Sequence, residues 1–151
     1  MTAAGSPLVR GQFPGAAYVI DASVAIKWVI AEPGTEAALR LLGHELCAPD
    51  LLVAECANIL WRKTRLGELS AREASLAARL LERAEIDLIP MRRLLDRALA
   101  LAVALDHPAY DAMYLALAEN TGRPFVTADA RLLRKLQGSA IPAVALADFA
   151  S

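Results

Sequence analysis

Apolar residues in this chain gather in short continuous runs, separated by longer stretches of mixed polarity. A short apolar run bounded by polar or turn residues is typical of a strand. The runs predict strands within 18–21, 45–49, 85–90, 123–129 and 141–148. Because these runs do not alternate between apolar and polar positions, we expect strands buried on both faces, as in a parallel sheet covered by helices.

Between these runs, apolar residues recur at intervals of three and four, which is the spacing of one helix face. Ser23 and Asp50 stand where a side chain can cap a helix, and Ser70 with Glu73 has the spacing of a capping box. The periodicity predicts helices over 23–32, 33–43, 50–67, 70–84, 92–106, 110–120 and 130–138. In the fifth of these helices, six residues are expected to face inward, namely Leu94, Leu95, Ala98, Leu101, Ala102 and Leu105.

The alternation of strands with helices indicates the fold class. It predicts an α/β fold, a three-layer α/β/α sandwich with a short central parallel sheet of four to five strands. The 151 residues suffice for one domain with a hydrophobic core and are too few for two comfortable ones. We expect this domain to span 18–148 and to follow a loose N-terminal tail at 1–17.

Composition and charge indicate where the protein acts and which partners it lacks. No apolar run approaches the roughly 20 residues that cross a bilayer, and the N-terminus lacks an apolar block long enough for a secretory signal. We therefore expect a cytoplasmic protein with no membrane partner. Cys47 and Cys56 stand among apolar neighbours, so we expect buried thiols rather than metal ligands. The formal net charge of −1 counts against a protein that coats nucleic acid nonspecifically.

Four carboxylates stand where the apolar pattern would not call for them. Asp21 and Asp129 follow predicted strands, and Asp111 opens a helix that is otherwise apolar. Glu55 lies one turn into a helix, among apolar neighbours. Each aspartate also has an ordinary structural reading: Asp21 as a turn residue, Asp111 as a charge favoured by the helix dipole, and Asp129 as a helix cap.

Taken together, the four carboxylates point to a metal site. Ligand sites in open α/β sheets form beyond the carboxyl ends of the strands. Converging carboxylates repel each other, and a divalent cation offsets that repulsion. Oxygen ligands suit Mg²⁺ or Mn²⁺ and not zinc. A Mg²⁺ ion held in this way lowers the pKa of a bound water and clamps a phosphate oxygen, which is the chemistry of phosphodiester hydrolysis.

Four segments carry a resemblance to a known family. "YVIDASVAIKWV", "DLLVAECANILWR", "YDAMYLALAEN" and "FVTADARLLRKL", in this order and spacing, resemble the PIN-domain nucleases. The group they resemble most is the VapC-type toxin of bacterial type II (VapBC) toxin–antitoxin pairs. The resemblance covers roughly residues 18 to 146, and its strongest part is the "YDAMYLALAE" segment with the downstream "TAD".

The resemblance implies an activity and assigns roles to the acids. It implies a Mg²⁺- or Mn²⁺-dependent endoribonuclease in which Asp21, Asp111 and Asp129 touch the metal and Glu55 helps to orient the nucleophile. All four positions are acidic here, as an active nuclease requires. Polar residues beside the acids could donate hydrogen bonds to them or serve ordinary capping: Ser23, Asn58 and Thr127.

The resemblance also implies partners. It implies a homodimer that is silenced by a cognate VapB-type antitoxin, and an RNA substrate such as a tRNA or rRNA loop. A single strand or loop fits an open acidic cleft, since its bases are reachable. Trp28 and its apolar neighbours could form either core or part of a groove for a partner helix.

Two further expectations concern residues near the acids. His107 precedes Asp111 in a predicted turn, and we expect a solvated side chain there rather than a general base. Basic residues fall into three groups, each of which could simply be a solvated face. Arg131 and Arg134 follow Asp129 closely, so we expect one of them to help position the RNA backbone. The other groups are Arg62, Lys63 and Arg65, and Arg92, Arg93 and Arg97.

Two other functions remain open on the sequence. One is a housekeeping PIN nuclease in RNA maturation. The other is a non-catalytic PIN module that only binds a partner, although four intact acids argue against it. A receiver or phosphatase fold would need an acid pair or a "DxD" after the first strand, and "DASVA" offers neither.

Overall fold

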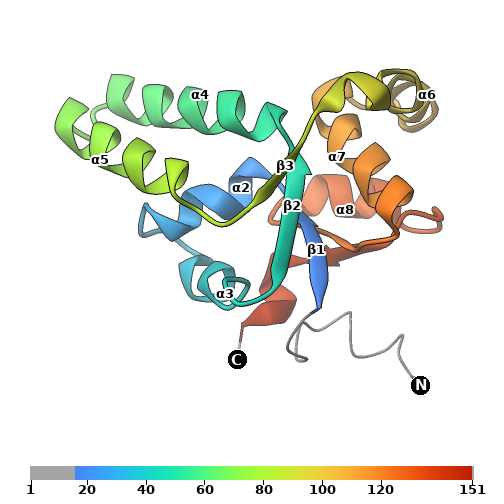
Figure 1. Ribbon diagram of the computed structural model, residues 1–151, viewed down its shortest axis with the longest axis horizontal. Helices are drawn as coiled ribbons and strands as arrows, with labels where there is room; N and C mark the ends of the chain where they lie inside the picture. The colour runs from blue at the N-terminus through green and yellow to red at the C-terminus, as the bar shows by residue number, and fades with distance from the viewer. Residues whose placement is uncertain (1–15, 151) are drawn as a thin grey trace.

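The computed structural model describes residues 16–150, so most of the expected tail at 1–17 lies outside the described residues. Five strands form one sheet in the order β3-β2-β1-β4-β5, and every neighbouring pair is parallel (Figure 1). They are β1 (Ala17–Ile20), β2 (Glu45–Pro49), β3 (Asp87–Ile89), β4 (Phe125–Thr127) and β5 (Ala143–Ala145). The expected α/β class and parallel sheet are confirmed.

Strand β1 forms the middle of the sheet, with β2 on one side and β4 on the other. Tyr18, Val19 and Ile20 are fully buried, as the continuous apolar run predicts. The chain runs from β1 outward to β2 and β3, then returns across the sheet to β4 on the opposite side of β1. The strand order therefore reverses between β1 and β4, and ligand sites in such sheets form beyond the carboxyl ends of the strands at this reversal.

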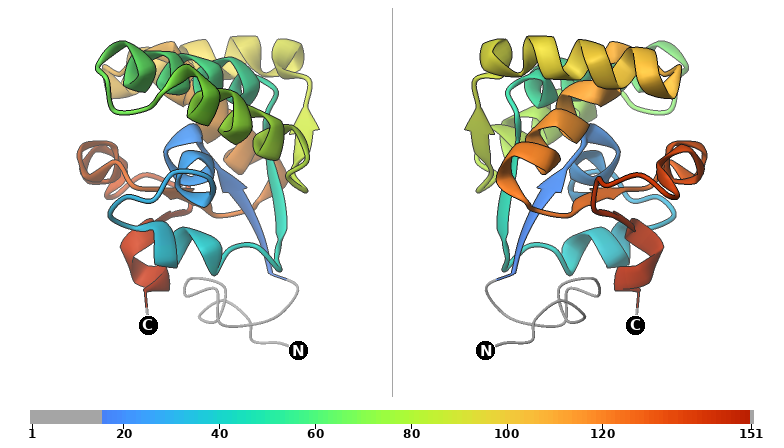
Figure 2. Two further views of the ribbon diagram at one scale, coloured as in Figure 1. Left: turned by 90° about the vertical axis from the view of Figure 1, so that its left-hand side faces the viewer. Right: turned by 90° about the vertical axis from the view of Figure 1, so that its right-hand side faces the viewer.

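Helices cover the two faces of the sheet. The helices that follow β1 and β2 come forward in one side view, and α6 and α7 come forward in the opposite one (Figure 2). The first set comprises α2 (Ala22–Ala25), η1 (Ile26–Trp28), α3 (Thr35–Leu39), α4 (Leu51–Arg65) and α5 (Ala71–Glu82). The later part of the chain holds η2 (Met91–Leu94), α6 (Leu95–Leu105), α7 (Ala109–Thr121), α8 (Ala130–Leu136) and η3 (Leu146–Phe149). None of the helices described is long and apolar enough to cross a membrane.

Helix α7 is the central helix of the core. It contacts β1, β2 and β4 on the sheet side and packs against α6. Six of its residues are buried, namely Ala112, Tyr114, Leu115, Ala116, Leu117 and Ala118. The many alanines let sheet and helix approach closely around it, and a helix that is apolar on nearly all sides is typically buried. This packing gives α7 a fixed position, and with it the residues of its first turn.

Several sequence predictions about local structure are confirmed. The capping box at the start of α5 is present, with Ser70 accepting from the Glu73 N–H and Glu73 accepting from the Ser70 N–H. Both cysteines are free and buried. Trp28 is part of the packing: its indole N–H donates to the Ala38 carbonyl oxygen at 2.8 Å and ties η1 to α3.

Other local predictions are wrong. Strand β3 is exposed at Asp87 and Leu88, because it lies at the sheet edge, so not every strand is buried on both faces. Leu95 is exposed at the first residue of α6 instead of facing inward. Asp50 occupies the cap position of α4, yet its side chain makes no capping hydrogen bond.

Candidate functional site

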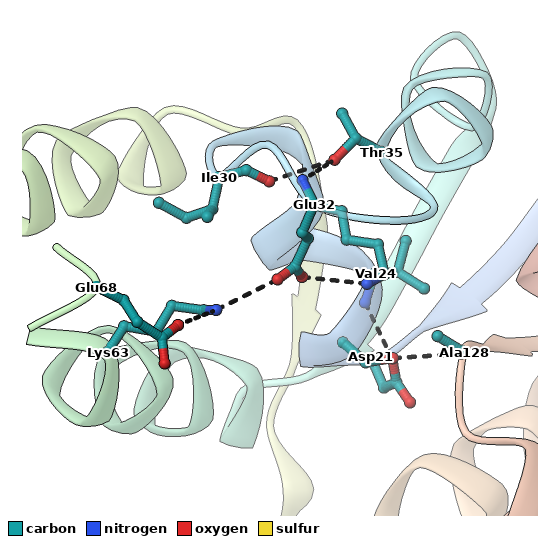
Figure 3. A network of polar contacts seen from close by, with 10 residues as sticks. Asp21, Val24, Ile30, Glu32, Thr35, Lys63, Glu68 and Ala128 are labelled. Atoms are coloured by element: carbon teal, nitrogen blue, oxygen red, sulfur yellow. Dashed lines mark hydrogen bonds and ion pairs between the residues drawn. The ribbon is translucent and has the colours of Figure 1, made fainter. Parts of the chain in front are cut away.

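Asp21 lies directly after β1 and caps α2. Its Oδ1 accepts hydrogen bonds from the Val24 N–H at 3.3 Å and from the Ser23 hydroxyl at 2.5 Å. The predicted cap at Ser23 is therefore wrong: Asp21, two residues earlier, caps the helix, which begins at Ala22. Figure 3 shows Asp21 beside Val24 and close to Ala128 of the segment that follows β4.

Strand β4 supplies the other hydrogen bond to Asp21. Thr127, at the end of β4, is fully buried and donates its hydroxyl to Asp21 Oδ2 at 2.6 Å. Ile20 pairs with Val126 in the register of β1 and β4. The next residue on each strand, Asp21 on one and Thr127 on the other, therefore lie side by side. Ser23 also accepts from the Ala128 N–H at 3.3 Å. The two strand ends at the reversal of the sheet are thus joined through one carboxylate.

Burial makes the negative charge of Asp21 energetically unfavourable. The residue is only 8 % exposed. Burial raises the pKa of Asp21 from 3.8 to about 6, in spite of its three hydrogen bonds, and the negative charge of Asp111 adds to this rise. A neighbouring cation would relieve both effects.

Glu55 approaches the same region from α4. Tyr114 of α7 donates its hydroxyl to Glu55 Oε1 at 2.6 Å. Burial raises the pKa of Glu55, the Tyr114 hydrogen bond opposes this rise, and the charge of Asp111 adds to it. Burial also raises the pKa of the neighbouring Cys56 thiol, to about 12, which agrees with the prediction that this cysteine is an inert core residue.

Asp111 lies in the first turn of α7 and contacts His107 one turn earlier. The two side chains meet with His107 Nε2 2.6 Å from Asp111 Oδ2. The His107 side chain is only 9 % exposed, so the predicted solvated histidine is wrong. Its Nδ1 is buried and has no hydrogen-bond partner among residues 16–150. Because a buried N–H without an acceptor is costly, this places the proton of a neutral ring on Nε2, where it is donated to Asp111.

Asp129 follows β4 and caps α8. Its Oδ1 accepts from the N–H groups of Arg131 at 3.0 Å and Leu132 at 3.1 Å. The ordinary reading of Asp129 as a helix cap therefore holds. Within the described part of the chain, its Oδ2 makes no hydrogen bond, so the cap leaves this oxygen available.

All four carboxylates line one cavity of about 680 Å³. It opens between the start of α2, the α4 helix and the first turn of α7. Its other lining residues are Ala22, Ser23, Leu51, Ala54, Asn58, Ile59, Arg62 and Tyr110. Asp21, Glu55, Asp111 and Asp129 come from four different elements that the sheet and α7 bring together. Of the three polar neighbours considered in the sequence, Asn58 and Ser23 line the cavity, and Ser23 and Thr127 donate hydrogen bonds to Asp21.

The donor set fits a hard divalent cation that keeps part of its water shell. All four groups are oxygen ligands, which is what Mg²⁺ and Mn²⁺ prefer. As the side chains stand, no three Asp, Glu, His or Cys residues between 16 and 150 would enclose an ion by themselves. Mg²⁺ is commonly held by one or two carboxylates and several waters, so a bound ion would need fewer than three of these side chains as direct ligands.

Basic residues are distributed unevenly around this cavity. Arg131 and Arg134, predicted from their sequence position to face the substrate, are not among the lining residues, but Arg62 is. Lys63 forms ion pairs with Glu32 at 3.3 Å and with Glu68 at 3.4 Å, which ties α4 to the segment after η1 (Figure 3).

Sequence reasoning missed part of the surroundings of the acids. It gave no role to Tyr114, although Tyr114 stands three residues after Asp111 on α7, and it placed Arg62 in a basic group that could simply be a solvated face. Arg62 lies seven residues after Glu55, a spacing that returns to the same helix face. That spacing is a signal the sequence does carry. The orientation of His107 has no comparable signal.

The chain is similar to a known protein family, to a named relative and to solved structures. The PIN domain family model matches residues 18–137. The chain is 34 % identical over 128 residues to a protein named ribonuclease VapC3 from Pyrobaculum aerophilum, which covers 82 % of this chain and 98 % of that protein. The crystal structure of PAE2754 from the same organism superposes with a TM-score of 0.67 at 26 % identity, covering 87 % of this chain and 90 % of the other.

A more distant likeness is to VapBC2 from Rickettsia felis, whose crystal structure was solved bound to a DNA fragment from their promoter. It superposes with a TM-score of 0.60 over 85 % of this chain and 98 % of that chain. At 10 % identity, this likeness speaks for the fold alone.

Proposed function

Because the chain belongs to the PIN-domain family, we propose that it is a Mg²⁺- or Mn²⁺-dependent endoribonuclease and the toxin of a toxin–antitoxin pair. The observation that carries this proposal is the meeting of Asp21, Glu55, Asp111 and Asp129 in one cavity at the reversal of the strand order. The relative named ribonuclease VapC3 supports the choice of RNA and of the toxin class.

Asp21, Asp111 and Asp129 are the proposed ligands of the cation, some of them through its bound waters, since the three side chains do not enclose an ion by themselves. Asp21 accepts hydrogen bonds on both carboxylate oxygens, and Asp111 and Asp129 each on one, so their orientation is set before any ligand arrives. A bound Mg²⁺ or Mn²⁺ supplies a water of lowered pKa and a positive charge beside the phosphate.

Glu55 is the proposed proton acceptor. Its raised pKa brings its basicity closer to neutral pH, where a general base works best. Tyr114 occupies Oε1, and Oε2 makes no hydrogen bond to the described residues. We therefore propose that Oε2 of Glu55 accepts a proton from the water that attacks the phosphate. Asn58, one turn further along α4, lines the same cavity and can orient that water or the substrate.

The proposed substrate is single-stranded or loop RNA, with tRNA and rRNA loops as the first candidates. A cavity of this size, open to solvent and lined by acids, requires a strand whose backbone can bend into it, which a stiff duplex does not provide. The proposed partners are a cognate VapB-type antitoxin and a second copy of the chain as a homodimer.

The test is RNA cleavage by the purified protein. We expect Mg²⁺-dependent cleavage of total bacterial RNA and growth arrest when the chain is expressed without its antitoxin. Asp21→Asn should abolish both, whereas Glu85→Gln, which neutralises an exposed acid outside the cavity, should leave both unchanged. Arrest by Asp21→Asn equal to that of the parent would refute the assignment. Cleavage without growth arrest would favour a housekeeping nuclease, and the absence of both would favour a partner-binding module.

A further inference from the structure

Tyr110 presents an aromatic ring at the rim of the acidic cavity. It stands next to Asp111 in α7 and is 68 % exposed, whereas Tyr114 one turn later is fully buried. Tyr110 lines the cavity and makes no hydrogen bond to the residues that the structure describes. Exposed aromatic side chains beside a strand-binding cavity are the usual platforms on which unpaired bases stack.

Arg62 also lines the cavity, from the last turn of α4. It follows Glu55 by seven residues, about 10 Å along the helix on the same face. Its neighbours already have partners, since Lys63 pairs with two glutamates and Arg65 lies over the Trp61 ring. For Arg62 the described part of the chain contains no ion pair.

The position of Arg62 joins two hollows in the surface. It lines the acidic cavity and also an adjacent one of about 280 Å³, where Lys27 and Lys63 are paired with Glu32 and Glu68. Ser23 and Ile59 line both hollows too, so the surface is continuous between them. An RNA strand whose phosphate reaches the acids therefore has a path over Arg62.

Arg62 can offset the electrostatic repulsion between the acidic cavity and an RNA strand. Four acids repel a polyanion, and among the residues that line the acidic cavity Arg62 is the one Lys or Arg side chain described. Arginine binds phosphate through a planar set of donors. A cation at the border of the cavity offsets the repulsion without neutralising the carboxylates themselves.

Resting on the proposed function, we propose that Tyr110 and Arg62 are the substrate-positioning residues of this cavity. Tyr110 stacks one unpaired base, and Arg62 binds a phosphate of the same strand beside the one that is cleaved. The enzyme therefore selects RNA in which a base is free to leave its stack, at a loop or in a single strand.

The test measures binding in a background that does not cut. Fluorescein-labelled single-stranded RNA of random sequence is titrated with Asp21→Asn protein, and with the same protein carrying Y110A, Y110F, R62A or R62K, at several salt concentrations. Two matched controls alter exposed residues outside the cavity, Trp61→Ala for the aromatic ring and Arg79→Ala for the charge. Thermal unfolding of each variant verifies that it is folded.

The two residues should leave different signatures. Tyr110→Ala should weaken binding at least about fivefold with an unchanged salt dependence, since stacking involves no counterion release. Tyr110→Phe should bind within about twofold of the parent. Arg62→Ala should weaken binding and reduce the slope of log K against log salt by about 0.7, the value for one phosphate contact on a single strand. Arg62→Lys should restore the slope but not the full affinity, and the controls should match the parent.

Affinities of Tyr110→Ala and Arg62→Ala within about twofold of the parent would overturn the proposal, and so would a loss at only one of the two positions. If unchanged RNA affinity came with altered sedimentation of the same variants, the surface would be an interface between copies of the chain. Failure of the proposed function itself would be seen in a different measurement: the parent, which keeps Asp21, would cut no RNA with Mg²⁺ or Mn²⁺. If that parent cuts, and Tyr110→Ala and Arg62→Ala introduced into the cutting parent leave its KM unchanged, only the positioning assignment fails.

Discussion

His107 and Asp111 form a hydrogen-bonded pair, with Nε2 2.6 Å from Oδ2, across one turn at the start of α7. The pair depends on the end of α6. Asp106 adopts a left-handed conformation with φ 51°, and the His107 N–H then bonds to the Ala102 carbonyl oxygen at 3.0 Å. The chain folds back there, and Pro108 occupies the cap position before α7. The turn thus brings an imidazole N–H against one oxygen of a carboxylate that we assign to metal binding.

His107→Ala should weaken the response to metal. Loss of the donor frees the Asp111 carboxylate to rotate, and changes to partners of this kind typically cost about 10- to 100-fold in metal affinity or activity. The measurement is the Mg²⁺ concentration that gives half-maximal RNA cleavage. His107→Gln should recover part of the loss, since its side-chain N–H₂ can replace Nε2–H.

His44→Gln is the matched control for the His107 variants. His44 also has a buried Nδ1 without a partner among residues 16–150, but it packs edge-on against Tyr18 and does not line the cavity. Its substitution should leave the Mg²⁺ dependence unchanged. An equal shift for His44→Gln and His107→Ala would show that general destabilisation, not the contact with Asp111, is responsible.

Asp21→Asn should stabilise the metal-free protein above about pH 6. Because burial raises the pKa of Asp21 from 3.8 to about 6, the native state keeps a proton that the unfolded chain has lost between these values. The free energy of unfolding of the parent therefore falls as pH rises through this window, by an amount on the order of 3 kcal/mol. The amide can still accept from Val24 and Ser23, and it can donate to Thr127.

Urea unfolding in EDTA at pH 4 and pH 8 measures this effect. The difference in stability between Asp21→Asn and the parent should grow with pH, and Mg²⁺ should stabilise the parent more than the variant. Glu85→Gln should follow the parent at both pH values. A variant that is less stable than the parent at pH 8 would contradict the assigned cost of burying the Asp21 charge.

Tyr114→Phe should shift the pH dependence of cleavage. The substitution keeps the ring that packs against Phe125, with centroids 6.1 Å apart, and removes only the hydroxyl that donates to Glu55. That hydrogen bond lowers the pKa of Glu55 against the effect of burial, so its loss should raise this pKa. Since a general base must be deprotonated, the acid limb of the pH–rate profile should move to higher pH. A profile that superposes on that of the parent would remove Glu55 from this role.

Leu115→Ala tests the packing that positions Asp111. Leu115 is fully buried in α7, so the cavity left by its truncation should cost about 2–5 kcal/mol of unfolding free energy. Val103→Ala on exposed α6 surface should change it by no more than about 0.5 kcal/mol. Chemical unfolding of the two variants, followed by circular dichroism, gives both values. Similar losses for the two would contradict the central position of α7.

Much of the fold could be predicted from the sequence, because the strands and helices alternate with distinct apolar patterns. Asp21 and Asp129 could be expected beyond the carboxyl ends of the strands, because Asp21 directly follows one strand and Asp129 comes just after another. The edge strand β3 could not be told from a buried strand, since its apolar run looks the same and only its place in the sheet exposes it. The roles of the four acids stay predictions, although the structure brings their side chains to one cavity.

Side-chain contacts at the cavity were harder to predict. His107 looked like a turn residue, and only the left-handed Asp106 turns its ring toward Asp111. Arg131 and Arg134 are close to Asp129 in sequence, but consecutive helix positions point in different directions, so closeness along the chain does not give closeness to the cavity. Arg62 is far from the aspartates in sequence, but it shares a helix face with Glu55 and lines the cavity.

The most direct test of the account is calorimetric titration of Mn²⁺ into protein stripped with EDTA. We expect binding by the parent and by Glu85→Gln, and an affinity at least about tenfold lower for Asp111→Asn, because one of the assigned ligands is lost. Absence of binding by the parent, or equal affinity of the parent and Asp111→Asn, would contradict a cation held by these carboxylates.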